Sequence, residues 1–71
     1  MATWFTGFYG RGENHYIGYC PEVPGANGQG ETMEECRESL GEATKLILQD
    51  RLEEALKNMP AGTVREPVMV E

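Results

Sequence analysis

The chain has 71 residues and a formal net charge of −6, from 12 acidic and 6 basic side chains. A domain of this length buries only about 60% of the surface that its unfolded chain exposes, so its core is thin. The bases are scattered singly, whereas a nucleic-acid-binding domain usually gathers them where it contacts phosphates. The charge therefore disfavours direct nucleic-acid binding and suits a basic protein partner.

Targeting segments and ligand-binding clusters are not evident in the sequence. The N-terminus has no secretory signal pattern, and no apolar run approaches the roughly 20 residues of a membrane helix. We therefore expect one cytoplasmic domain over residues 1–71, with no separate C-terminal DNA-binding module. Cys20 and Cys36 are expected to be reduced, with a disulfide between them as the alternative. Because His15 is the only histidine, we expect neither a metal site nor a cofactor.

Two strands and a turn are predicted at the start of the chain. The segment TWFTGFY, residues 3–9, is rich in aromatic residues and threonine, which fit a pleated surface. The turn-forming segment GRGEN follows, and HYIGYC, residues 15–20, reads as the second strand of a hairpin. Pro21 ends that strand because proline cannot donate to a ladder. A short third strand is predicted over residues 26–29.

A helix is predicted from Met33 to about Lys57. Thr32 and Glu35 form a capping box, in which the Thr32 hydroxyl accepts from the Glu35 backbone N–H and Glu35 reaches back to the backbone N–H of Thr32. Asn58 and Pro60 then end the helix.

The segment TVREPVMV, residues 63–70, reads as a last strand with Pro67 at an edge position. The predicted fold class is therefore α+β, in the order β-β-β-α-β. One long helix would pack on one face of a small sheet.

The helix carries two apolar stripes. The first is Met33, Cys36, Leu40, Ala43 and Ile47; the second, rotated by roughly 140° at 100° per residue, is Leu48, Leu52, Ala55, Leu56 and Met59. The helix would be about 37 Å long, whereas a compact domain of this length is roughly 29 Å across. We expect the helix either to bend near Gln49–Arg51 or to project from the domain.

A projecting second stripe would need cover, and two-fold dimers are the commonest solution. The sequence therefore predicts a homodimer, or a higher even oligomer, with Leu48, Leu52, Leu56 and Met59 as candidate self-association residues. The alternative is a bent helix that buries the second stripe in the chain's own core.

No constellation of residues indicates catalysis. His15 has no local nucleophile beside it, and the helix acids are typical of a solvated face. The glycine-rich loop before the helix lacks the lysine of a Walker loop and the spacing of a dinucleotide fingerprint. Residues 3–9 contain no acid to hold a metal ion on an opening strand. We therefore expect no enzyme activity and no catalytic residue.

Residues 16–43 resemble the HicB-like antitoxin family. Pro21-Glu22-Val23-Pro24-Gly25 matches the family's P-E-L-P-G step, and Gln29-Gly30-Glu31-Thr32 matches its Q-G-D-T step into a helix. Met33-Glu34-Glu35 and Glu42-Ala43 match the acidic and alanine positions of that helix. Ala26 stands where the family usually has cysteine, and Cys36 where it usually has alanine.

The resemblance implies a partial RNase-H-like fold and a role as an antitoxin. HicB-like proteins bind and neutralise HicA-type toxins, which are small basic ribonucleases that cut mRNA. Pro21, Glu22 and Pro24, in a loop stiffened by its prolines, are the candidate partner surface. A stand-alone, homo-oligomeric domain of the same fold without a toxin partner is the alternative. A nucleic-acid-binding or enzymatic protein is the third reading.

Overall fold

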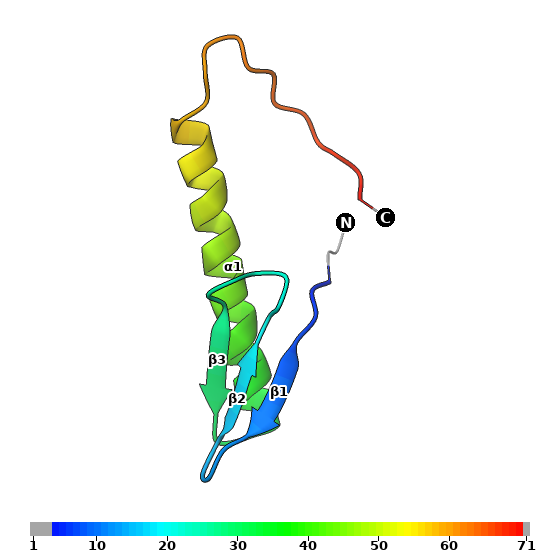
Figure 1. The fold of residues 1–71 in the computed structure, drawn as a ribbon, viewed down its shortest axis with the longest axis vertical. Coiled ribbons are helices and arrows are strands. Elements are labelled where there is room, and N and C mark those ends of the chain that lie inside the picture. Colours follow the sequence, from blue (N-terminus) through cyan, green and yellow to red (C-terminus); the bar gives the residue numbers. More distant parts are fainter. Residues whose placement is uncertain (1–3, 71) are drawn as a thin grey trace.

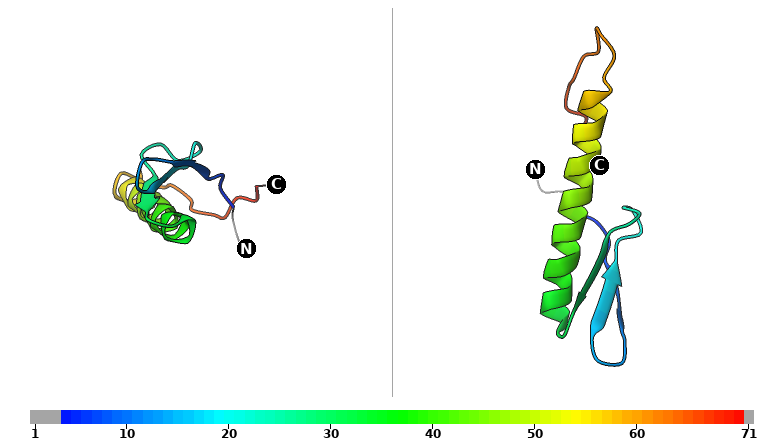
Figure 2. Two further views of the ribbon diagram at one scale, coloured as in Figure 1. Left: turned by 90° about the horizontal axis from the view of Figure 1, so that it is seen from below. Right: turned by 90° about the vertical axis from the view of Figure 1, so that its left-hand side faces the viewer.

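The structure, a computed structural model that describes residues 4–70, consists of a three-stranded sheet and one long helix (Figure 1). The strands are β1 (Phe8–Arg11), β2 (Tyr16–Tyr19) and β3 (Asn27–Gly30), and the helix is α1 (Met33–Lys57). The sheet is antiparallel, in the order β1-β2-β3. The helix lies against one face of the sheet (Figure 2). The predicted α+β class and its β-β-β-α order are confirmed.

The first strand begins later than the sequence predicts. Residues 4–7 are not in a strand, and pairing starts with Phe8 opposite Tyr19. Since β2 ends at Tyr19 and Pro21 follows, residues before Phe8 have no strand to pair with. The third strand lies over Asn27–Gly30, so both of its ends are one residue later than predicted.

The two faces of the sheet differ in side-chain size. Tyr9, Gly18 and Gly28 are neighbours across the three strands and belong to the face that the helix covers. Phe8 and Tyr19 belong to the opposite face, where their rings meet edge to face with centroids 5.5 Å apart. On the covered face, β2 and β3 therefore present glycines to the helix, and Tyr9 of β1 lies beside them.

Gly28 and Gly30 bring the helix close to the sheet. A Cβ added at Gly28 would lie 2.5 Å from the backbone N of Leu40, and one at Gly30 would lie 2.7 Å from the backbone N of Cys36. Only glycine, which has no Cβ, therefore fits at these two positions without a shift of the helix. The helix backbone lies directly on β3, and this contact fixes the position of α1.

The start of the helix agrees with the predicted cap. Thr32 is extended, and its hydroxyl oxygen accepts from the backbone N–H of Glu35 at 3.1 Å. The reciprocal half differs, because the Glu35 carboxylate accepts from the Thr32 hydroxyl at 3.2 Å rather than from its backbone N–H. At the other end, the Asn58 backbone N–H donates to the carbonyl oxygen of Glu54 at 3.2 Å, so the helix ends where predicted.

The core is small and lies at one end of the sheet. Cys20, Val23 and Ala26 come from the loop between β2 and β3, and Leu40 comes from the helix. Cys36 is also fully buried, with its Sγ against Gly18 of β2. Both cysteines are free thiols, as the sequence predicts for a reduced protein.

The helix is continuous and does not bend near Gln49–Arg51 (Figure 1). Its first half lies on the sheet and its second half projects beyond it (Figure 2). Of the two arrangements that the sequence allows, the structure has the projecting helix.

The predicted last strand, residues 63–70, is not formed. The chain reverses in a turn at Pro60–Thr63, where the Thr63 backbone N–H donates to the carbonyl oxygen of Pro60 at 3.2 Å and Gly62 has φ +85°. Residues 64–70, here called the tail, then run back on the side of the projecting half of the helix and stop above the sheet, without pairing to it (Figure 1). Pro67, which lacks an N–H, removes one ladder bond from any pairing by this segment.

Candidate partner-binding surfaces

The loop between β2 and β3 presents the three predicted partner residues together. Val23 and Ala26 point into the core, while Pro21, Glu22 and Pro24 are exposed. Backbone hydrogen bonds from Val23 to Cys20 and from Ala26 to Val23, both at 3.1 Å, hold the loop compact. The loop is thus a stiff, exposed knob anchored by buried aliphatic side chains.

Glu22 has a structural partner that the sequence did not indicate. Both of its carboxylate oxygens accept from the backbone N–H of Thr6 at 3.0 Å, and one also accepts from the Thr6 hydroxyl at 2.7 Å. The Cys20 thiol donates to the same carboxylate at 3.5 Å. Glu22 therefore joins the N-terminal segment to the loop, in addition to any role in partner binding.

These bonds make the acid stability of the protein depend on Glu22. The Thr6 hydroxyl hydrogen bond holds the pKa of Glu22 below its usual value. A carboxyl group with a lowered folded pKa stabilises the fold above its unfolded pKa of about 4.3, and the contribution is lost as pH falls through the folded pKa. The free energy of unfolding of wild type should therefore fall as the pH is lowered from about 5 to about 3, and that of Glu22→Gln should fall less over the same range.

Circular dichroism during acid titration of wild type and Glu22→Gln measures this difference. Glu13→Gln is the matched control, because Glu13 lies in the exposed β1–β2 turn away from Thr6. If the free energy of unfolding falls equally in wild type and in Glu22→Gln between those pH values, the assigned role of the carboxylate is wrong.

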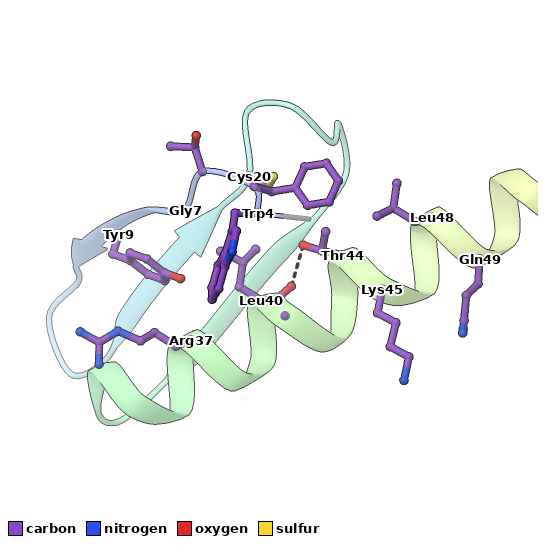
Figure 3. Close-up of a pocket in the computed structure, with 13 residues that line it drawn as sticks. Trp4, Gly7, Tyr9, Cys20, Arg37, Leu40, Thr44, Lys45, Leu48 and Gln49 are labelled. Atoms are coloured by element: carbon purple, nitrogen blue, oxygen red, sulfur yellow. Dashed lines mark hydrogen bonds between the residues drawn. The ribbon is translucent and has the colours of Figure 1, made fainter. Parts of the chain in front are cut away.

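A groove lies between the N-terminal segment and the helix, beside the free edge of β1. Its volume is about 870 Å³, and Figure 3 shows Trp4 and Tyr9 on one side with Leu40, Thr44 and Leu48 on the helix. The charged residues that line it are both basic, Arg37 and Lys45. The walls are largely apolar, so the groove suits an apolar segment without excess positive charge.

Sequence reasoning did not identify this groove. The aromatic residues of the N-terminal segment were predicted to pair in a strand, and the helix residues that face them alternate between apolar, polar and basic. The signal that was present is the predicted strand at residues 63–70, because a fourth strand beside β1 would need a surface of this kind.

The second apolar stripe of the helix is open to solvent where the helix projects. Leu52 is 49% exposed and Met59 is 43% exposed, while Leu48 and Leu56 are half-buried. Leu48 contacts the edge of the core, so the uncovered part, here called the stripe, is Leu52, Leu56 and Met59. The alternative in which these side chains fill the chain's own core is not what the structure shows.

The structure gathers no candidate catalytic group in the part of the chain it describes. His15 is exposed in the hairpin turn, in a shallow hollow with Gln29, Glu31 and Glu35, whereas Cys20 and Cys36 are buried. Across residues 4–70, no three metal-binding side chains come together. Over the same range, no helix has the length and apolar character needed to cross a bilayer.

Comparison with known proteins gives one close relative. A UPF0150 protein of Synechocystis sp. is 44% identical over 55 residues, which cover 78% of this chain and 76% of that protein. No model of a protein family matches the chain, and no solved structure matches it. A similarity of this level over most of both chains shows that the chain belongs to the UPF0150 family.

Proposed function

We propose that this chain is an antitoxin-type binding module that neutralises a small basic ribonuclease of the HicA type. The ordered P-E-V-P-G and Q-G-E-T steps support the proposal because they resemble the HicB-like pattern. The proposal includes a partial RNase-H-like fold and a cytoplasmic location. It assigns binding, not catalysis, to the chain: β1 has the sequence FYGR, which offers no acid for a metal-dependent nuclease.

One observation carries the proposal, and that is the charge on the outer side of the helix. Glu38, Glu42 and Glu53 are all exposed and lie within roughly 60° of one another on a helical wheel, turned away from Leu40 and the sheet. A row of acids along a rigid helix gives a basic partner a complementary surface and speeds its association. The knob of Pro21, Glu22 and Pro24 adds a stiff contact that costs little entropy to order.

Co-expression with a small basic toxin encoded beside this chain tests the function directly. We expect growth to be restored, and we expect the purified complex to weaken as salt rises because exposed charges are screened. Glu38→Lys/Glu42→Lys should weaken binding at least about tenfold at low salt, since like charges across an interface are strongly unfavourable.

Glu13→Lys is the matched control, because it reverses a charge at an exposed position of the β1–β2 turn, outside the helix. Binding that is insensitive to salt and to Glu38→Lys/Glu42→Lys would argue against the acidic helix as the contact. Failure to restore growth, with no complex formed, would refute the antitoxin role.

The second candidate is a stand-alone homo-oligomeric domain without a toxin partner. The stripe of Leu52, Leu56 and Met59, of which Leu52 and Met59 are exposed and Leu56 is half-buried, favours it, because apolar contacts of this kind are typical of oligomer interfaces. The two candidates differ in the neighbouring reading frame: a toxin-like gene beside this one favours the first, and its absence favours the second.

A further inference from the structure

The carboxylate of Glu22 is held by neutral donors, and they use up its capacity to accept. Its Oε1 accepts from the backbone N–H of Thr6 at 3.0 Å and from the Cys20 thiol at 3.5 Å. Its Oε2 accepts from the same N–H at 3.0 Å and from the Thr6 hydroxyl at 2.7 Å. A carboxylate has about four lone-pair sites, so a further donor reaches Glu22 only by displacing one of these.

The segment that Glu22 holds has few other attachments. Residues 4–6, here called the strap, come before β1. Among residues 4–70, every hydrogen bond of the strap comes from Thr6 and ends on Glu22. Packing holds its aromatic rings only in part, because Trp4 is 89% exposed and Phe5 is 41% exposed. The position of the strap therefore depends on the Glu22 carboxylate.

The loop that carries Glu22 has attachments of its own. Val23 and Ala26 are buried in the core, and a backbone hydrogen bond of 3.1 Å joins them. On the outer side of the loop, the Arg51 guanidinium donates to the carbonyl oxygen of Pro24 at 3.4 Å. When the hydrogen bonds between Glu22 and the strap break, the strap is free to move, whereas the knob keeps its shape.

The strap also forms part of the groove beside β1. Trp4 and Phe5 line this groove together with the helix residues Leu40 and Leu48. Figure 3 shows Trp4 on the side of the groove opposite these leucines. One carboxylate thus connects the knob to the wall of the groove, and a change in what Glu22 binds changes that wall.

We propose that Glu22 is a latch that a basic protein partner opens. A guanidinium group brings a positive charge and two parallel N–H donors, and its pair with a carboxylate is stronger than hydrogen bonds from neutral donors. An arginine of a partner at the knob therefore takes the carboxylate from Thr6 and releases the strap. The proposal rests on the proposed function for the basic character of the partner.

The latch has a consequence that an ordinary contact residue lacks. Breaking the bonds to Thr6 costs part of the free energy that the arginine gains, so a weaker latch should give tighter binding. Coupling of this kind is reciprocal. A molecule that fills the groove and holds Trp4 in place should therefore lower the affinity of the knob for a basic partner.

Relaxation of backbone ¹⁵N nuclei tests the latch in the free chain. In wild type, residues 4–6 should have order parameters close to about 0.85, the value of rigid backbone, and in Glu22→Ala these should fall below about 0.6. Glu13→Ala is the matched control, because it removes an exposed carboxylate in the β1–β2 turn, and it should leave the strap rigid. A strap that is equally rigid in wild type and in Glu22→Ala would overturn the proposal.

Titration of the ¹⁵N-labelled chain with a hexa-arginine peptide tests the opening. The Val23 amide resonance reports binding at the knob, and we expect the Thr6 amide resonance to move with it towards its position in Glu22→Ala. Thr6→Val lacks the hydroxyl donor, so its dissociation constant at the knob should be roughly 2- to 10-fold lower than that of wild type. Thr6→Ser keeps both donors and should match wild type.

The other outcomes of the titration overturn the proposal. They are a peptide that shifts Val23 while Thr6 keeps its hydrogen bonds, a peptide that does not bind at the knob, and a Thr6→Val chain that binds no more tightly than Thr6→Ser. Neither experiment uses a toxin. A latch that opens with the peptide, in a chain that forms no complex with a toxin, would therefore refute the proposed function alone.

Discussion

Gly28→Ala should cost about 3 kcal/mol of the free energy of unfolding, a large share for a domain this small. The added methyl carbon would lie 2.5 Å from the backbone N, 2.7 Å from the Cα and 2.9 Å from the Cβ of Leu40. These are backbone and core atoms rather than the end of a flexible side chain, so the helix itself must move away from β3. Such a shift would separate Leu40 from the core residues Cys20 and Val23.

Urea unfolding followed by circular dichroism measures the loss, and the thermal midpoint should fall by roughly 12–24 °C at 4–8 °C per kcal/mol. Gly10→Ala is the matched control. Gly10 is also a strand glycine with an ordinary backbone, but nothing lies within 4 Å of an added Cβ there, so the change should be neutral or slightly stabilising. A Gly28→Ala protein within about 1 kcal/mol of wild type would contradict the close contact of helix and sheet.

The role of Gly28 also shows where the sequence is ambiguous. In the sequence, the glycines of GANGQG are typical of a loop before the helix, although a short strand is predicted over residues 26–29; in the structure Gly28 and Gly30 lie inside β3. A glycine that allows a turn and a glycine that allows close packing look the same in a single sequence. Only the position of the helix, which depends on contacts between distant segments, separates the two.

The helix was predictable because its signals are local. The Thr32 cap, the acidic first turn and the Asn58–Pro60 end each act within one turn of the chain, and the structure places the helix at Met33–Lys57. The prediction of a last strand over residues 63–70 was wrong because a strand does not depend on local signals alone. An extended, β-branched segment becomes a strand only where another strand accepts it, and residues 63–70 of the single chain have no such partner.

The candidate surfaces were predictable only in part. The exposure of Pro21 and Pro24 follows from their place in a turn-rich loop between strands. The bonds from Thr6 to Glu22, at 2.7–3.0 Å, join residues that are 16 positions apart, and no local pattern indicates such a contact. The groove likewise depends on how the N-terminal segment and the helix face each other across the edge of β1.

The second large effect is expected for Leu52→Glu/Leu56→Glu, which should convert a dimer into a folded monomer. Two leucines from each chain lie at the proposed contact, and burying one such side chain is worth about 1.5–3 kcal/mol. Loss of all four, with charges of like sign placed opposite one another, should raise the dissociation constant by at least about 1,000-fold. Sedimentation at micromolar concentration would then give the mass of one chain for the variant and twice that for wild type.

Leu46→Glu separates this effect from a general effect of added charge. Leu46 is 65% exposed and lies roughly 120° from Leu52 on the helix, away from both the stripe and the sheet. The control should therefore remain a dimer. Because Leu52 is half exposed in the single chain, the double variant should keep its helix content by circular dichroism. A wild type that is monomeric, or a double variant that unfolds, would contradict the dimer, since unfolding would place these leucines in the chain's own core.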